Sequence, residues 1–191
     1  MFNKKPLLFF AALFLCSTLN ANSFDITLAV SSDEIRIGDS FEVEVLASFD
    51  PGEELFDFAF QVDPLGLITT KNSIVFEGWS LASGFLPFLS SSPSPLIDGQ
   101  ADFFSPVFGG SSVLLATLQF SALTFGSTEL VIEGLASDFH GAAFVDVTNN
   151  LVVRDIVSQT RISVVPDTSS TGVLGMIATF FFIGIRSLVS S

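Results

Sequence analysis

The sequence has few of the side chains that support metal, thiol or phosphate chemistry. It contains one cysteine, one histidine and no tyrosine, and only 7 lysines and arginines stand against 20 aspartates and glutamates. A single histidine and a single cysteine leave no credible set of zinc ligands. The shortage of basic residues excludes nucleic-acid binding, because phosphate backbones are bound by clustered lysine and arginine. The net charge of −13 is typical of a solvated acidic surface.

The first 23 residues have the three-part layout of a secretory signal peptide. Two lysines precede the apolar run Leu7–Leu15, and small or polar residues follow it. We expect cleavage between Ala21 and Ser23. A lipoprotein site at Cys16 is an alternative, but the bulky residues before that cysteine disfavour it. Cleavage after Cys16 leaves an exported chain without a disulfide, so its stability must come from core packing.

Residues 24–165 alternate apolar and polar side chains with a period of two, as in Phe56–Val62. Such alternation predicts strands with one face in a core and the other in water. Frequent glycine, proline and asparagine turns between short strands predict an all-β fold, a single β-sandwich or jelly roll. The expected strands are Phe24–Val30, Phe41–Val45, Phe56–Val62, Ser73–Phe76, Ala101–Phe104, Val113–Ala122, Thr128–Glu133, Ala142–Val147 and Gln159–Val165.

Several stretches of this region resemble cohesin domains. The residues that carry the resemblance are Ile35–Val45 with its Gly-Asp turn, Phe56–Pro64 ending in Asp-Pro, Leu115–Phe120 and Gly126–Leu130. The resemblance implies a cohesin-like sandwich over most of residues 35–165. Cohesins of cellulosomes bind dockerins through one sheet face, whereas many cohesin-like domains elsewhere have no known dockerin. No individual binding residue carries over from this resemblance.

Enzymatic motifs are sparse. His140 would have to serve any serine-histidine-aspartate triad, yet Asp138–Gly141 is typical of a loop, and Gly78–Ala82 lacks the last glycine of a nucleophile elbow. Acidic residues are too numerous to single out a pair for glycoside hydrolysis. We therefore expect no catalytic residues. The alternative is a polysaccharide-active hydrolase or a carbohydrate-binding accessory protein on a jelly-roll scaffold.

Oxygen ligands for a structural calcium ion are available in two places. They are the clusters Asp50/Glu53/Glu54 and Asp98/Asp102, neither of which matches an EF-hand loop. A structural calcium ion is therefore possible, but no cofactor is expected.

The stretch 79–96 interrupts the strand rhythm with prolines and serines but keeps Trp79, Phe85 and Phe88. Long loops with their own aromatic residues are often functional, and Trp79 could stack on a sugar ring or anchor a protein partner. The other interpretation is that these rings fold back as a lid over one end of the sandwich.

The C-terminal residues 166–191 have the composition of a sorting signal. An uncharged apolar stretch, 172–185, lies between a polar motif and the basic Arg186. The tail resembles the PEP-CTERM signals of exosortase substrates, in the variant that opens with Val-Pro-Asp. Its sorting-motif residues are Val165, Pro166, Asp167, Thr168, Ser169, Ser170, Thr171 and Arg186. Family tails usually end in a basic cluster, whereas this one has a single arginine.

That resemblance implies retention in the inner membrane by a hydrophobic helix, residues 172–189, until an exosortase-type enzyme cuts the motif. The alternative is a permanent membrane anchor, although residues 172–185 as a helix measure only about 21 Å against a hydrocarbon core of about 30 Å. Together these features predict an exported bacterial surface protein. Its sandwich is expected to be a non-enzymatic binding or matrix module for exopolysaccharide or an envelope protein.

Overall fold

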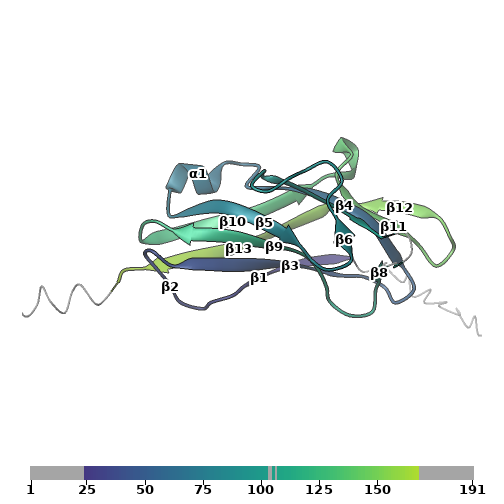
Figure 1. Cartoon of the computed structure of the whole chain (residues 1–191), viewed down its shortest axis with the longest axis horizontal. Coiled ribbons are helices and arrows are strands. Elements are labelled where there is room, and N and C mark those ends of the chain that lie inside the picture. The colour runs from purple at the N-terminus through teal and green to yellow at the C-terminus, as the bar shows by residue number, and fades with distance from the viewer. Residues whose placement is uncertain (1–23, 103–104, 106, 168–191) are drawn as a thin grey trace, which may run out of the picture.

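The computed structural model describes residues 24–102, 105 and 107–167, which form two layers of antiparallel strands packed face to face (Figure 1). The first sheet has four strands in the order β1 (Asp25–Val30), β3 (Ser40–Ser48), β9 (Val113–Ala122) and β5 (Ile74–Leu81). Its inward side chains are apolar and its outward ones largely polar, because strict alternation puts successive residues on opposite faces. In β3, for example, Val43 and Val45 are fully buried while Glu42 and Glu44 reach water.

The second sheet is built around β4. Along one path it orders β12 (Leu151–Arg154), β11 (Gly141–Val145), β4 (Glu54–Val62), β10 (Gly126–Gly134), β13 (Ile156–Val165) and β2 (Ile35–Arg36). On the opposite edge, β4 pairs with β7 (Leu96–Ala101) and β8 (Val107–Phe108), and β7 pairs in turn with β6 (Phe85–Leu86). The β13–β2 pair is parallel.

Phenylalanine dominates the core between the sheets. Phe58, Phe60, Phe120 and Phe144 are fully buried. The Phe58 ring stacks 6.0 Å from Phe60, and the Phe41 ring stacks 5.5 Å from Phe120. Burial of this many aromatic rings supplies a large hydrophobic driving force, consistent with a core that needs no disulfide.

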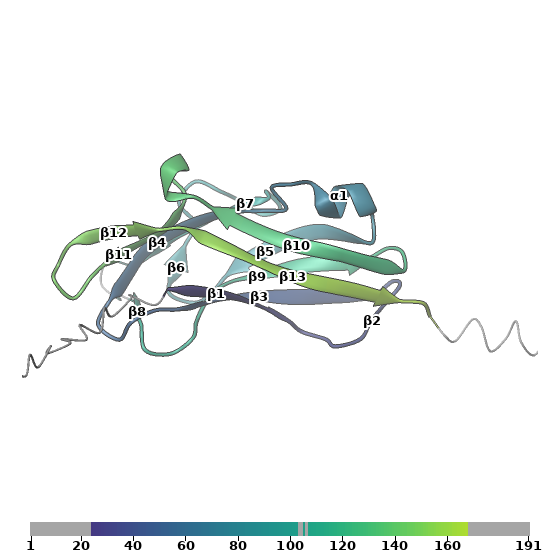
Figure 2. The ribbon, with the colours of Figure 1, turned by 180° about the vertical axis from the view of Figure 1, so that it is seen from behind.

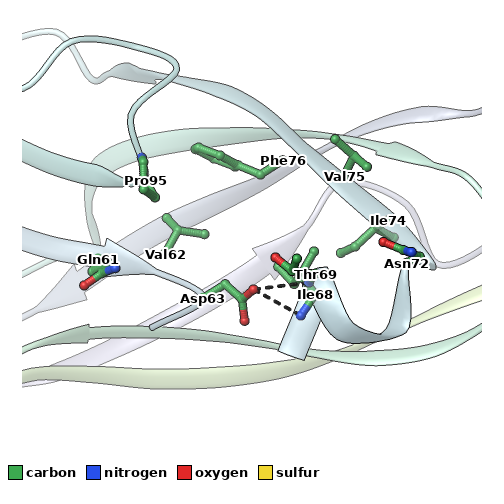
Figure 3. A pocket seen from close by; sticks show the side chains of 10 residues that line it. All are labelled: Gln61, Val62, Asp63, Ile68, Thr69, Asn72, Ile74, Val75, Phe76 and Pro95. Carbon is green, nitrogen blue, oxygen red and sulfur yellow. Dashed lines mark hydrogen bonds between the residues drawn. The ribbon is translucent and has the colours of Figure 1, made fainter. Parts of the chain in front are cut away.

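Two short helices connect the strands. Asp63 precedes α1 (Leu67–Lys71), and its carboxylate accepts hydrogen bonds from the backbone N–H groups of Leu67 and Ile68, at 2.7 and 3.1 Å. Figure 3 shows the bond from Ile68. These bonds satisfy donors that a helix start leaves unpaired. A pocket of about 400 Å³ lies between α1, the end of β4 and the start of β5, and Phe76 is one of the residues that line it. The second helix, η1 (Ala136–Asp138), is a 3-10 turn after β10.

The prediction of an all-β sandwich is confirmed, but two expected segments have different bounds in the structure. The strand expected at Ala101–Phe104 instead begins at Leu96 and ends at Ala101, and residues 103 and 104 lie outside the described part of the chain. The stretch from Trp79 to Leu96 is not one loop, because β5 continues to Leu81 and β6 lies within it. The reason is that β9 pairs with the whole of β5, beyond the short alternating segment visible in the sequence.

The described chain starts and finishes at opposite ends of the sandwich (Figure 2). The expected signal peptide and the expected hydrophobic helix 172–189 both lie outside the described residues. Among the residues that are described, no helix has the length and apolar character needed to cross a membrane.

Candidate functional site

A groove of about 500 Å³ runs over the outer face of the second sheet, where β4 is flanked by β7 and β11. The registers bring Asp57 between Ala143 of β11 and Gln100 of β7. Ala59 lies in the next row, between Gly141 and Asp98. Because alternate residues of a strand share a face, these side chains form the floor of the groove. We call this site the β4 groove.

One wall of the β4 groove is the loop that carries Phe88 and Leu89, both of which are exposed. Asp98 holds this loop in place. Its carboxylate accepts backbone N–H bonds from Phe88, Leu89 and Ser90, and a 2.6 Å bond from the Ser90 hydroxyl. Burial alone would raise the pKa of Asp98, but these hydrogen bonds to the ionised form hold the pKa below its usual value. The wall is therefore a preformed structure.

The facing wall comes from η1 and β12. Phe139 follows η1 in a left-handed backbone conformation with φ of 60°, and its side chain is 98% exposed. Leu151 and Val153 of β12 are also exposed, and Val153 pairs across the sheet with Ala143 on the groove floor. Together these exposed side chains make apolar surface available to another molecule.

Asp57 is the charged group at the floor. It forms no hydrogen bond or ion pair with any other described residue, and its side chain reaches water through the groove mouth. The surrounding protein nevertheless removes part of its hydration, and this desolvation raises the pKa of Asp57. An acceptor without a partner, surrounded by apolar side chains, is suited to receive a hydrogen bond from a docked molecule.

The β4 groove offers recognition rather than acid-base or nucleophilic chemistry. His140 lines it, but the imidazole makes no hydrogen bond to another described side chain, so no base is poised on a nucleophile. Sequence reasoning found the stretch that holds Phe88 and Leu89 but missed Phe139, Leu151 and Asp57. These residues come from different strands and loops, and only the strand registers reveal their proximity.

The three aromatic residues expected in a binding loop have different positions in the fold. Trp79 lies in β5 with 8% exposure, and its Nε1–H donates to the carbonyl of Ser94 at 2.9 Å. Phe85 is buried against Phe58, with ring centroids 5.1 Å apart. Phe88 alone of the three is exposed and lines the β4 groove. Trp79 and Phe85 therefore belong to the core, because β5 and β6 turn their side chains inward.

Each of the two candidate calcium clusters contains a residue with another role in the described structure. Glu53 is buried and pairs with Arg154, and Asp98 is enclosed by the loop that it holds. No group of three acidic, histidine or cysteine side chains that could hold a metal ion is found in the part of the chain that the structure describes.

The first residues of the expected sorting motif are accessible. Val165 is the last residue of β13, and Pro166 and Asp167 follow it in exposed positions. Residues 168–171 and Arg186, the rest of the motif, lie outside the described residues.

Comparison with protein-family models found no match, and comparison with curated proteins found none either. Solved structures do resemble the chain. The cohesin module of a family 33 glycoside hydrolase from Clostridium perfringens matches with a TM-score of 0.53 and 11% identity, over 76% of this chain and 99% of that module. A cohesin from Clostridium acetobutylicum matches with a TM-score of 0.48 and 17% identity, over 75% and 92%. The first likeness shows that the sandwich has a cohesin-like fold.

Proposed function

We propose that this chain is an exported, non-enzymatic module that binds another protein of the bacterial envelope through the β4 groove. The observation that carries the proposal is the facing pair of exposed apolar walls, Phe88–Leu89 on one side and Phe139 with Leu151 on the other. Soluble proteins rarely leave contiguous apolar surface uncovered unless another molecule covers it. The cohesin-like fold supports the same function class by analogy, which is a weaker argument than the groove itself.

The chemistry of the groove favours a protein over a glycan. Sugar sites need several hydrogen-bonding groups beside their aromatic faces. The walls of this groove include the aliphatic Leu89, Leu151 and Val153, and apart from Asp98, which holds the loop, its ionisable side chains are Asp57 and His140. The partner is expected to insert an apolar side chain between the walls and to donate a hydroxyl or basic N–H to Asp57. Charge complementarity with a chain of net charge −13 favours the basic donor.

Cross-linking inside the producing cell tests the proposal at one residue. A photoreactive phenylalanine analogue at Phe139 should give one dominant protein adduct. The same analogue at Phe125, an exposed phenylalanine at the opposite end of β10, is the matched control and should not give that adduct. Identical adducts at both positions would contradict a specific groove.

Affinity measurements with the cross-linked partner complete the test. A Phe139→Ser and Leu151→Ser variant of the full chain should bind the purified partner at least about tenfold more weakly, the loss expected for two central apolar contacts. Host exopolysaccharide serves as a competing ligand in the same assay. Binding to exopolysaccharide that depends on these residues, with no protein bound, would replace the proposed partner class by a glycan.

The termini determine where this module acts. We propose export through the signal peptide 1–23, retention in the inner membrane by residues 172–189, and cleavage of the motif at Val165–Thr171 by an exosortase-type enzyme. This assignment is supported by the motif and the exposed positions of Pro166 and Asp167. An enzyme that cuts this motif needs an accessible, extended segment, and the end of β13 supplies its start.

Peptide mass mapping of the mature protein from the host envelope and medium checks the processing proposal. The expected C-terminus lies within residues 165–171, with or without an added group. Recovery of intact Ser191 in the membrane fraction would show a permanent anchor and no exosortase processing.

A further inference from the structure

Two turns and the C-terminal exit meet at one end of the sandwich. Val165 at the end of β13 pairs with Arg36 of β2. The following β2–β3 turn contacts the end of β9, where the Gly38 N–H donates to the carbonyl of Ala122 at 2.9 Å. The chain therefore leaves the fold beside the β9–β10 turn, residues 123–125, as the position of β2 and the end of β13 in Figure 1 shows.

Apolar side chains are exposed at this end. Phe125 is 68% exposed and Leu123 is 48% exposed, and both lie in the β9–β10 turn. Ile37 in the β2–β3 turn is exposed beside them. Turns of exported sandwiches are normally polar, so this clustering is unusual for a surface that meets only water. We call Ile37, Leu123 and Phe125 the exit-end patch.

Two basic side chains without ion pairs lie near the exit-end patch, which also has acidic neighbours in Asp39, Glu129 and Asp167. Ion pairs in the described residues join Arg36 to Glu34 and Arg154 to Glu53, whereas Lys71 and Arg161 form none. Both of these unpaired cations reach Ser127, just beyond Phe125. The Lys71 ammonium contacts the Ser127 carbonyl at 3.5 Å, and the Arg161 Nε–H donates to the Ser127 hydroxyl at 2.7 Å. Glu129 is the cross-strand neighbour of Arg161 but makes no ion pair with it.

The length of chain after β13 limits how far this end can be from the apolar tail. Residues 166–171 separate Val165 from the uncharged run that begins at Gly172. Six residues span at most about 20 Å when fully extended. A tail held in a bilayer therefore keeps the exit-end patch within about that distance of the lipid headgroups.

We propose that the exit-end patch rests on a lipid surface, with Phe125 and Leu123 entering the interface and Lys71 and Arg161 facing phosphate headgroups. Apolar side chains flanked by cations are the combination that binds such surfaces. This contact would orient the module with the β4 groove pointing away from the membrane, because Phe125 precedes and Phe139 follows β10, a strand about 30 Å long. The inference rests on the proposed membrane retention by the tail.

Site-specific fluorescence on the full chain tests this orientation. An environment-sensitive dye is attached to Phe125→Cys, or to the matched control Phe139→Cys, in a chain whose Cys16 is replaced by serine. The protein is reconstituted into phosphatidylglycerol vesicles with nitroxide-labelled acyl chains. We expect a blue shift and strong nitroxide quenching at position 125, and neither at position 139. Adding Lys71→Gln and Arg161→Gln should reduce the quenching at 125.

Each remaining outcome overturns the inference in an identifiable way. Vesicle-bound protein whose dye at 125 stays in water would overturn the lipid contact while leaving tail retention intact. A blue shift without nitroxide quenching would indicate contact with a second copy instead of lipid. Failure of the chain to join vesicles would overturn both tail retention and this inference, whereas the cross-linking result at Phe139 would be unaffected.

Discussion

Replacement of Arg154 by methionine is expected to lower the free energy of unfolding by about 3–5 kcal/mol, the usual cost of breaking a buried ion pair from one side. The Arg154 guanidinium donates to both carboxylate oxygens of Glu53, with Nη1 at 2.7 Å from Oε2. The Glu53 side chain is 2% exposed. The Arg154 guanidinium carbon lies 4.8 Å from the centroid of the Phe144 ring, and a methionine side chain can keep this packing. The measured loss of stability therefore reflects removal of the charge. Chemical denaturation measures the change.

A second substitution provides an internal check on that interpretation. In the Arg154→Met variant, Glu53 is a buried carboxylate without its counter-charge. The double variant Glu53→Leu, Arg154→Met should recover much of the loss, because an apolar replacement removes both charges from the interior. A double variant that is no more stable than Arg154→Met would contradict the ion-pair explanation.

The sequence predicted the central strands well, because their core-facing side chains alternate strictly with polar ones. Phe56–Val62 and Val113–Ala122 correspond closely to β4 and β9. β7 escaped prediction because its residues, Leu-Ile-Asp-Gly-Gln-Ala, contain an Asp-Gly pair that is typical of a turn. In the structure Gly99 lies under Phe58, where a Cβ would come within 2.6 Å of the ring, and Asp98 is covered by the 88–90 loop. Contacts with residues distant in the sequence therefore explain why this segment forms a strand and not a turn.

The candidate site was less accessible to sequence reasoning than the fold. Phe139 and Leu151 are separated by several turns and strands from Phe88, and no local pattern relates them. Their proximity follows from three registers, β12 with β11, β11 with β4 and β4 with β7, and the last two depend on long-range pairing. Trp79 shows the same limit, since the sequence left open whether it contacts a partner or packs back onto the sandwich, and the end of β5 buries it. Whether a large aromatic residue is exposed depends on how the strands pair, which the local sequence does not show.

Replacement of Asp98 by alanine is expected to affect both the stability of the fold and the shape of the β4 groove. The substitution leaves the backbone N–H groups of Phe88, Leu89 and Ser90 without their shared acceptor. Hydrogen bonds to a charged acceptor contribute about 1.5–3 kcal/mol each, and they are not additive, so we expect a loss of about 3–5 kcal/mol. The Phe88–Leu89 wall should then move, and partner binding should weaken even though neither wall residue has changed.

The matched control is Asp98→Asn, which keeps the size of the side chain and one acceptor oxygen but cannot ionise. Because hydrogen bonds lower the folded pKa of Asp98, its stabilising contribution is present above the unfolded pKa of about 3.9 and is lost as the pH falls through the folded value. The wild-type chain should therefore lose its advantage over Asp98→Asn in strong acid and keep it at neutral pH. Urea denaturation of both chains across this range measures the difference. An advantage that is independent of pH would mean that shape, and not the carboxylate charge, holds the wall of the β4 groove.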